Sequence, residues 1–166
     1  MELRDLRALP IFSTLNGDEL LQVKGVTREK RFREGDVIMQ EGEVGDTMYM
    51  VVEGLVEVSK SLTLRFGDDD FRKREKVLTR FRPEDHVVFG EMALIARDTR
   101  SATIMAVSDC RLIEIDREGF LGLVESLPAL GVKVLLKISE LLISRLRQSG
   151  RDVIRLTTAL SIALSK

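Results

Sequence analysis

Between Lys30 and Ile115 the sequence is built from short apolar runs separated by glycines, and this pattern constrains the fold more than any other feature. The stretch RFREGDVIMQEGEVGDTMYMVVEGLVEVSK alternates apolar and polar residues and carries Gly35, Gly42, Gly45 and Gly54 at turn-like positions. Such alternation favours β-strands, and glycine accepts the positive φ that tight turns need. The pattern predicts an antiparallel barrel or jelly roll, with these glycines at corners between strands.

Further strands are predicted beyond this stretch. LTLRF and KVLTRF are separated by GDDDFRKRE, an acidic and then basic run that is typical of a solvated hairpin tip. Its three aspartates, Asp68 to Asp70, lack the spacing and the distal glutamate of an EF-hand loop, so we do not expect a calcium site. IMAVSDCRLIEIDREGF predicts another strand pair, and Asp116 is a plausible N-cap for a following helix.

Helices are predicted on both sides of the strand region. DLRALPIFSTLNGDELLQVKGV predicts short helical pieces, with Asn16 as an N-cap. A long helix is predicted from about Leu130 to Leu164, with a possible break or bend at Gly150. Residues at alternating steps of four and three form a coiled-coil seam, namely Leu142, Leu146, Ser149, Val153, Leu156, Leu160 and Ala163. The seam predicts a partner helix, although the same spacing would serve packing on the chain's own barrel.

The composition excludes several classes of function. The chain has 26 basic and 27 acidic residues, so there is no global positive charge for nucleic acid or anionic lipid. Cys110 is the only cysteine, which excludes an internal disulfide and a cysteine-ligated cluster, and we expect it to be a buried strand residue. The single histidine, His86, is expected in an exposed loop and not at a metal. No apolar run approaches the ~20 residues that span a bilayer, so we expect a cytoplasmic protein.

The stretch FGEMALIARDTRSAT, Phe89 to Thr103, contains the residues that we expect to bind a ligand. A strand end followed by a short helix would point the N–H groups of Gly90, Met92 and Ala93 at an anion. Arg100 returns to the same place after a turn, and its planar guanidinium can bond two phosphate oxygens at once.

The carboxylate of Glu91 would repel a phosphate, and its natural partner in such a site is a pair of hydroxyls. In dinucleotide-binding folds a carboxylate accepts hydrogen bonds from the ribose hydroxyls, and Glu91 could do the same on a different fold. Phosphate and ribose side by side indicate a nucleotide, and the small residues Ala93, Ser101 and Ala102 leave room for it. No nucleophile–base pair and no metal cluster is present, so the pattern indicates binding and not catalysis.

F-G-E-M-A-L with the nearby R-S-A-T resembles the phosphate-binding cassette of the cyclic-nucleotide-binding domains. These domains occur in catabolite-activator-type regulators, cyclic-nucleotide-dependent kinases and gated channels. FREGDVIMQEGEVGDTMYMVVEGLVEV resembles the family's first strands, and RLIEIDREGFLGLVESLPALGVKVLLKISELLISRLR its last strand and two helices. The resemblance implies an α+β fold, an eight-stranded antiparallel β jelly-roll barrel with N-terminal helices, a short cassette helix and a long C-terminal helix. It divides the chain into a β-roll domain, residues 1–130, and a helix, residues 131–166, that would mediate dimerisation.

The resemblance also implies roles for individual residues. Glu91 would bind the ribose 2′-hydroxyl and Arg100 the cyclic phosphate, while Ser101 would contact the phosphate or the amino group of guanine. Both cAMP and cGMP therefore stay open, with cAMP favoured. The ligand set is Phe89, Gly90, Glu91, Met92, Ala93, Arg100, Ser101 and Ala102, together with Ser149, which would reach the adenine from the long helix, and an apolar wall of Val58, Leu78 and Phe81.

The chain departs from the family pattern in two places. RPEDHVVFGE has Glu84 where the family has glycine, and two additional residues, which puts the local loop path in doubt. Only RDVIRLTTALSIALSK follows Ser149, too little for a winged helix-turn-helix, so we expect no direct nucleic-acid binding. The expected function is a stand-alone cyclic-nucleotide sensor without cofactor or membrane contact, a homodimer that acts on an unknown downstream protein. The alternatives are a transcription regulator truncated before its DNA-binding module and a ligand-free dimeric scaffold.

Overall fold

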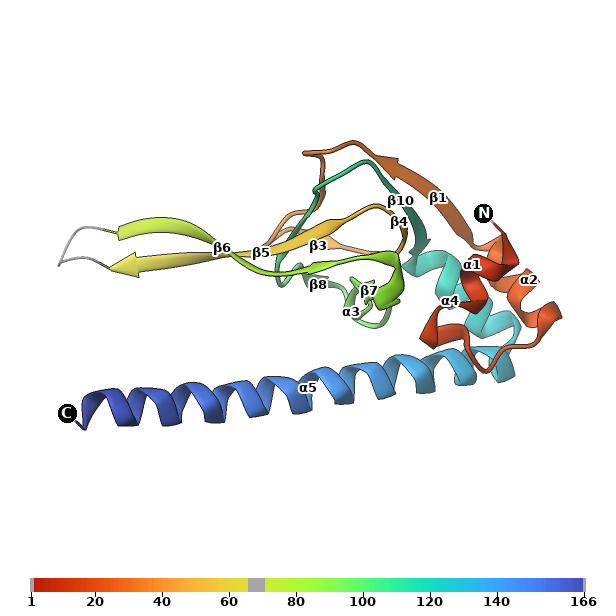
Figure 1. Cartoon of the computed structure of the whole chain (residues 1–166). Helices are drawn as coiled ribbons and strands as arrows, with labels where there is room; N and C mark the ends of the chain where they lie inside the picture. Colours follow the sequence, from red (N-terminus) through yellow and green to blue (C-terminus); the bar gives the residue numbers. More distant parts are fainter. Residues whose placement is uncertain (1, 66–70, 166) are drawn as a thin grey trace.

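The computed structural model describes residues 2–65 and 71–165 (Figure 1). The helices are α1 (Leu3–Arg7), the 3₁₀ turn η1 (Pro10–Phe12), α2 (Gly17–Gly25), η2 (Pro83–Asp85), α3 (Met92–Ile95), α4 (Arg117–Ser126) and α5 (Pro128–Leu164). The strands are β1 (Thr27–Phe32), β2 (Val37–Met39), β3 (Val44–Gly45), β4 (Thr47–Glu53), β5 (Val56–Arg65), β6 (Phe71–Phe81), β7 (Val88–Phe89), β8 (Asp98–Thr99), β9 (Thr103–Ala106) and β10 (Cys110–Asp116).

Every strand pair among the described residues is antiparallel. One four-stranded sheet has the order β1-β10-β4-β7 and the other has the order β2-β9-β5-β6, while β3 and β8 form a separate pair. The prediction of antiparallel sheets with a long C-terminal helix is confirmed. Eight of the ten described strands lie in the two four-stranded sheets, and the short β3–β8 pair is additional. The closed eight-stranded barrel stays a prediction.

The core has two parts. One cluster joins the N-terminal helices, α4 and the start of α5 to β4 and β10, with Phe12, Met50 and Ile138 fully or almost fully buried in it. The second cluster lies among the strands themselves and includes Tyr49, Phe89 and the completely buried Leu112. The first cluster fixes the helices against the sheets, and the second supports the cassette segment that begins at Phe89.

The predicted N-caps are confirmed. The Asn16 side chain accepts from the backbone N–H of Glu19 at 2.9 Å, and Glu19 returns the bond to the N–H of Asn16. The Asp116 side chain accepts from the N–H of Gly119 at 2.7 Å. Each cap satisfies backbone donors that the first helical turn would otherwise leave unpaired. Cys110 is buried at the start of β10 and His86 is exposed at the end of η2, as expected.

Strands β5 and β6 form a long hairpin that extends beyond the other strands (Figure 1). Their pairing runs from Val56 opposite Phe81 to Arg65 opposite Phe71, with one irregularity after Val58 that leaves Leu78 without an opposite residue. This confirms the predicted hairpin but corrects its tip, because residues 71–75, which were expected in the tip, belong to strand β6 and pair with β5. The three aspartates considered as a calcium site lie outside the described residues.

Helix α5 is continuous, and the break expected at Gly150 does not occur. Its first turns are buried against the core at Leu130, Val134 and Ile138, whereas every residue from Ile143 to Ser165 except Asp152 is exposed. In Figure 1 the exposed half runs in the same direction as the β5–β6 hairpin. No helix among the described residues combines the length and apolar character that crossing a membrane requires.

Candidate functional site

A cavity of about 240 Å³ lies between the strands of the second sheet, the segment from Phe89 to Ala102 and one side chain of α5. Eleven of the twelve residues predicted to bind a ligand line it: Val58, Leu78, Phe81, Phe89, Gly90, Glu91, Met92, Ala93, Arg100, Ser101 and Ala102. Met39, Thr79, Thr99, Ile104 and Arg145 complete the wall. Residues far apart in the sequence therefore meet in one place, although their role in binding remains a prediction.

Arg100 is a buried cation at one end of the cavity. Its residue is 9% exposed, and its guanidinium donates to the backbone oxygen of Thr47 at 2.7 Å and to the Thr47 hydroxyl at 2.8 Å. Among the residues whose side chains are described, none brings a carboxylate within 4.0 Å of these nitrogens. Burial lowers the pKa of Arg100, and the charges of the Tyr49, Asp46 and Glu43 groups oppose this. The site thus holds a positive charge whose close partners are all neutral oxygens.

Two glycines make room for this guanidinium. A Cβ at Gly45 would overlap Nε and the guanidinium carbon of Arg100, and one at Gly90 would lie 2.8 Å from a terminal nitrogen of Arg100 and 2.6 Å from the Thr47 oxygen. Gly90 also has a φ of +78°, which side chains rarely adopt. The sequence pattern predicted a simple strand corner at Gly45, whereas the structure shows that its missing side chain creates the space for Arg100.

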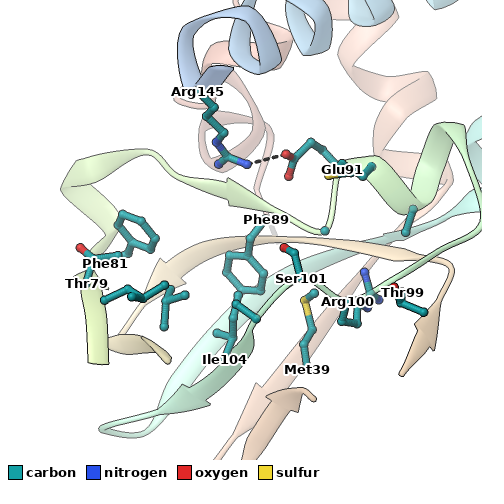
Figure 2. A pocket seen from close by; sticks show the side chains of 16 residues that line it. Met39, Thr79, Phe81, Phe89, Glu91, Thr99, Arg100, Ser101, Ile104 and Arg145 are labelled. Atoms are coloured by element: carbon teal, nitrogen blue, oxygen red, sulfur yellow. Dashed lines mark hydrogen bonds and ion pairs between the residues drawn. The ribbon is translucent and has the colours of Figure 1, made fainter. Parts of the chain in front are cut away.

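Glu91 is buried at the mouth of the cavity and is paired with α5. Its residue is 3% exposed, and the Arg145 guanidinium donates to Oε1 of Glu91 at 2.5 Å (Figure 2). Arg145 also donates to the backbone oxygen of Val88 at 2.5 Å. Since a buried carboxylate without a partner costs several kcal/mol, this ion pair supports the position of Glu91. It also ties the cassette segment directly to the long helix.

The other end of the cavity is apolar. Figure 2 shows Phe81 and Thr79 on the side away from Arg100, with Phe89, Ile104 and Met39 between the two ends. Beneath Phe89, the ring of Tyr49 lies 5.8 Å away, between centroids, and the Tyr49 hydroxyl donates to Glu114 at 2.7 Å. Burial raises the pKa of Tyr49 to about 12, and the bond to Glu114 adds to the rise. One elongated cavity therefore offers a cation at one end and apolar side chains at the other.

The backbone of the cassette segment differs from the expectation in one respect. The N–H of Ala93 donates to the backbone oxygen of Gly90 at 3.1 Å, so it is used within the turn. The prediction that Ala93 presents a free N–H to a ligand is therefore wrong. The helix predicted after Glu91 does form, but α3 is only four residues long and ends at Ile95.

Ser149 does not line the cavity. It lies on the exposed part of α5, one helical turn beyond Arg145, and the structure does not bring it to the other predicted residues. Four residues rotate the helix by only about 40° beyond a full turn but advance it by about 6 Å, so Ser149 lies on nearly the same face as Arg145 and farther along the axis, past the cavity. The proposal that Ser149 contacts a base is left without support from the cavity geometry.

Sequence reasoning missed Arg145, Thr47 and Gly45. The signal for Arg145 was present, because it lies four residues before Ser149 in the long helix and on the helical face of the buried residues Val134 and Ile138. No local motif marks Thr47, which meets Arg100 only through tertiary folding. Within the described part of the chain, no group of three or more His, Cys, Asp or Glu residues is arranged to hold a metal ion.

Comparison with known proteins gives a consistent result. The profile of the cyclic nucleotide-binding domain matches residues 29–126. The chain is 33% identical over 122 residues to a cyclic nucleotide-gated potassium channel of Rhizobium etli, a match that covers 73% of this chain and 30% of the channel. The catabolite activator protein of Thermus thermophilus superposes with a TM-score of 0.74 at 28% identity, over 89% of this chain and 63% of that one.

The regulatory domain of Toxoplasma gondii PKA, solved with cAMP, superposes with a TM-score of 0.57 at 30% identity, over 72% of this chain and 42% of that one. The chain spans about a third or less of the first curated relatives it matches, between 28% and 33% of their lengths.

Proposed function

Because the chain belongs to the family of cyclic nucleotide-binding domains, we propose that it is a sensor that binds cAMP in preference to cGMP and passes binding on through α5. It acts as a regulatory ligand-binding domain and not as a catalyst. The charge distribution of the cavity, with one buried cation at one end and apolar walls at the other, is the feature that supports this most directly.

The phosphate is assigned to Arg100. A buried guanidinium whose described close partners are neutral oxygens is completed electrostatically by an anion. Two of its nitrogens are already oriented by Thr47, so the remaining N–H groups are held ready for two phosphate oxygens. Ser101, on the same wall, adds a hydroxyl donor.

The ribose is assigned to Glu91. Arg145 engages Oε1, which leaves Oε2 to accept from a hydroxyl. The positive charge of Arg145 offsets the charge of Glu91, so an anionic ligand enters a site whose net charge is positive. This arrangement lets one carboxylate hold both the ligand and the helix.

The base is assigned to the apolar end, where Val58, Leu78 and Phe81 lie with Ile104. The preference for cAMP rests on the relative solved with that ligand and on the apolar character of this wall, which offers few groups to the polar edge of guanine. Thr79 and Ser101 are the hydroxyls through which cGMP could still be accepted.

Coupling is assigned to Arg145 in place of Ser149. Arg145 is the α5 side chain that lines the cavity, and it contacts both Glu91 and the strand β7 oxygen of Val88. A ligand that strengthens or loosens this contact has different affinities for docked and undocked α5, which is the condition for a ligand to shift an equilibrium. The exposed seam of α5 is the surface through which the sensor forms a homodimer.

Calorimetric titration with cAMP and cGMP tests the proposal. The wild type is expected to bind cAMP more tightly than cGMP, while Arg100→Ala loses binding and Arg100→Lys retains only part of it, because lysine lacks the bidentate fork. Arg147→Ala, at an exposed position of α5, is the matched control and binds as the wild type. Absence of binding to a folded wild type, or equal affinity of Arg100→Ala, would overturn the assignment.

A further inference from the structure

A buried carboxylate on β10 has no part in the ligand assignments made so far. Glu114 is only 6% exposed, and it lies opposite Tyr49 in the register of β4 and β10. The hydroxyl of Tyr49, a residue that is 8% exposed, donates to Oε2 of Glu114 at 2.7 Å. Because a buried carboxylate needs hydrogen bonds or an opposite charge, the groups that connect to Glu114 indicate what it does in the folded protein.

Tyr49 also connects to the residue that holds Arg100. Thr47 and Tyr49 are two positions apart in β4, so their side chains lie on the same face of the strand. Burial is the main cause of the raised pKa of Tyr49, a hydrogen bond with the Thr47 hydroxyl opposes the rise, and the bond to Glu114 adds to it. A bond that lowers the pKa of a phenol stabilises the phenolate, so the Thr47 hydroxyl donates and the Tyr49 oxygen accepts.

The bond between Arg100 and Thr47 requires the same direction. A hydroxyl has one hydrogen to donate and two lone pairs that accept. The Arg100 guanidinium donates to the Thr47 hydroxyl oxygen at 2.8 Å, which uses a lone pair and leaves the hydrogen for Tyr49. The phenol in turn gives its own hydrogen to Glu114. Each N–H or O–H in this hydrogen-bond chain therefore points from the cation towards the anion.

The two ends of the chain carry opposite charges, with two hydroxyls between them. Hydrogen bonds that all point from a cation to an anion polarise one another, so each is stronger than it would be alone. At the far end, Nζ of Lys30 lies 3.6 Å from Oε1 of Glu114, and the Lys30 side chain is 46% exposed. A carboxylate in direct contact with Arg100 would compete with a phosphate for the guanidinium, whereas one at this distance orients it without competing.

We propose that Glu114 is a positioning residue for the phosphate-binding guanidinium of Arg100. It acts through the hydroxyls of Tyr49 and Thr47, which hold the guanidinium in one orientation before the ligand arrives. Glu114, Tyr49 and Thr47 are not among the residues that line the cavity, so they act on a ligand only through Arg100. A side chain that is already fixed does not lose its rotational freedom on binding, which raises the affinity. This inference rests on the cyclic-nucleotide site proposed above and names what orients its phosphate-binding residue.

Calorimetric titration with cAMP of three variants tests each member of the chain. Tyr49→Phe keeps the ring but removes the acceptor for the Thr47 hydrogen, and we expect binding to weaken about tenfold. Glu114→Gln keeps an oxygen for the phenol but removes the charge, and we expect a loss of about threefold. Thr47→Val should weaken binding at least about tenfold, whereas Thr47→Ser retains the hydroxyl and should restore affinity to within about twofold of wild type.

The combination of Tyr49→Phe with Thr47→Val separates positioning from a general effect on the fold. Once Thr47→Val has cut the connection to Arg100, the further change Tyr49→Phe should alter cAMP affinity by less than about twofold. An equal loss from Tyr49→Phe in both backgrounds would overturn the proposal, because Tyr49 would then act only by supporting the fold. Wild-type affinity in Tyr49→Phe or in Glu114→Gln would contradict it equally.

Ile38→Val is the control for lost stability. Ile38 belongs to the same core cluster as Tyr49, is 9% exposed and is not among the residues that line the cavity. Its shortening should lower the free energy of unfolding in urea and leave cAMP affinity unchanged. A folded wild type that binds no cyclic nucleotide refutes the proposed function. A wild type that binds, with independent effects of Tyr49→Phe and Thr47→Val, refutes only the positioning role.

Discussion

Gly45 lies directly against Arg100, so that a methyl group at position 45 would occupy the volume of the guanidinium. The two residues belong to adjoining segments of backbone, because the N–H of Gly42 donates to the Arg100 oxygen at 2.9 Å and the N–H of Arg100 donates to the Glu43 oxygen at 2.8 Å. The buried cation is therefore held by a glycine turn that lies more than fifty residues earlier in the chain.

Gly45→Ala is expected to weaken cAMP binding at least tenfold, because the new methyl group displaces Arg100 from Thr47. The backbone at Gly45 is not in the left-handed region, so the loss arises from the overlap and not from strain. Isothermal titration calorimetry measures it. Gly122→Ala is the control, since a Cβ there meets no atom within 4 Å and alanine favours the helix by up to about 1 kcal/mol. Equal affinity of Gly45→Ala and wild type would contradict the role of this contact.

Glu91 and Arg145 are expected to show an energetic coupling of about 1–2 kcal/mol in the free energy of unfolding. Arg145→Gln leaves a buried carboxylate unpaired, whereas Glu91→Gln removes the charge, so the double variant loses less than the sum of the single ones. Denaturant unfolding of the four proteins in this cycle provides the measurement. Arg147→Gln combined with Glu91→Gln serves as the control pair, and additive losses in the test cycle would show that the ion pair is not significant.

The only tyrosine predicts a loss of stability at high pH. Tyr49 has its pKa raised from 10.0 to about 12, so between these values the unfolded chain releases the phenol proton while the folded chain retains it. The stability that the protonated phenol contributes is complete below pH 10 and falls by about 2–3 kcal/mol as the pH rises towards 12. Tyr49→Phe lacks this slope.

Urea unfolding of wild type and Tyr49→Phe at several pH values checks this. The two curves of unfolding free energy against pH should converge above pH 10, since at lower pH the variant lacks the 2.7 Å bond to Glu114. Parallel curves over the whole range would show that the phenol titrates normally in the folded protein.

Leu156→Glu is expected to give monomers, because it places a charge in the middle of the exposed seam. Leu156 is 70% exposed in the single chain, so the substitution should leave the fold of the monomer intact. Thr158→Glu introduces the same charge at a residue outside the seam, and this control should remain dimeric. Light scattering gives the mass of each protein, and a dimer that persists in Leu156→Glu would place the interface elsewhere.

The sequence predicted those parts of the fold that depend on neighbouring residues. Asn16 and Asp116 were identifiable as caps because a capping side chain bonds to a backbone group only a few residues away. Glycines between alternating apolar runs indicated the strands for the same reason. The strand order, with β4 between β10 and β7, depends on long-range contacts and was not predicted, whereas the jelly-roll class came only from the family resemblance.

The same distinction between local and long-range contacts applies to the candidate site. Glu91 and Arg100 lie nine residues apart in one segment, so the chemistry of both could be predicted from the sequence alone. Arg145 and Thr47 come from a helix and a strand that approach this segment only after folding, and no spacing rule connects them. The sequence could not show that Arg145, and not Ser149, lines the cavity, because the two residues are only four positions apart in one helix and the position of α5 along the strands decides which side chain reaches it.

The continuity of α5 through Gly150 turns a contact at the cavity into a displacement far from it. Leu164 lies about 28 Å beyond Arg145 at about 1.5 Å of rise per residue. Since the helix does not break between them, a tilt of only about 10° at Arg145 would move Leu164 by about 5 Å. A change in the contact between Glu91 and Arg145 that tilts α5 would therefore be amplified along the helix towards its last turn.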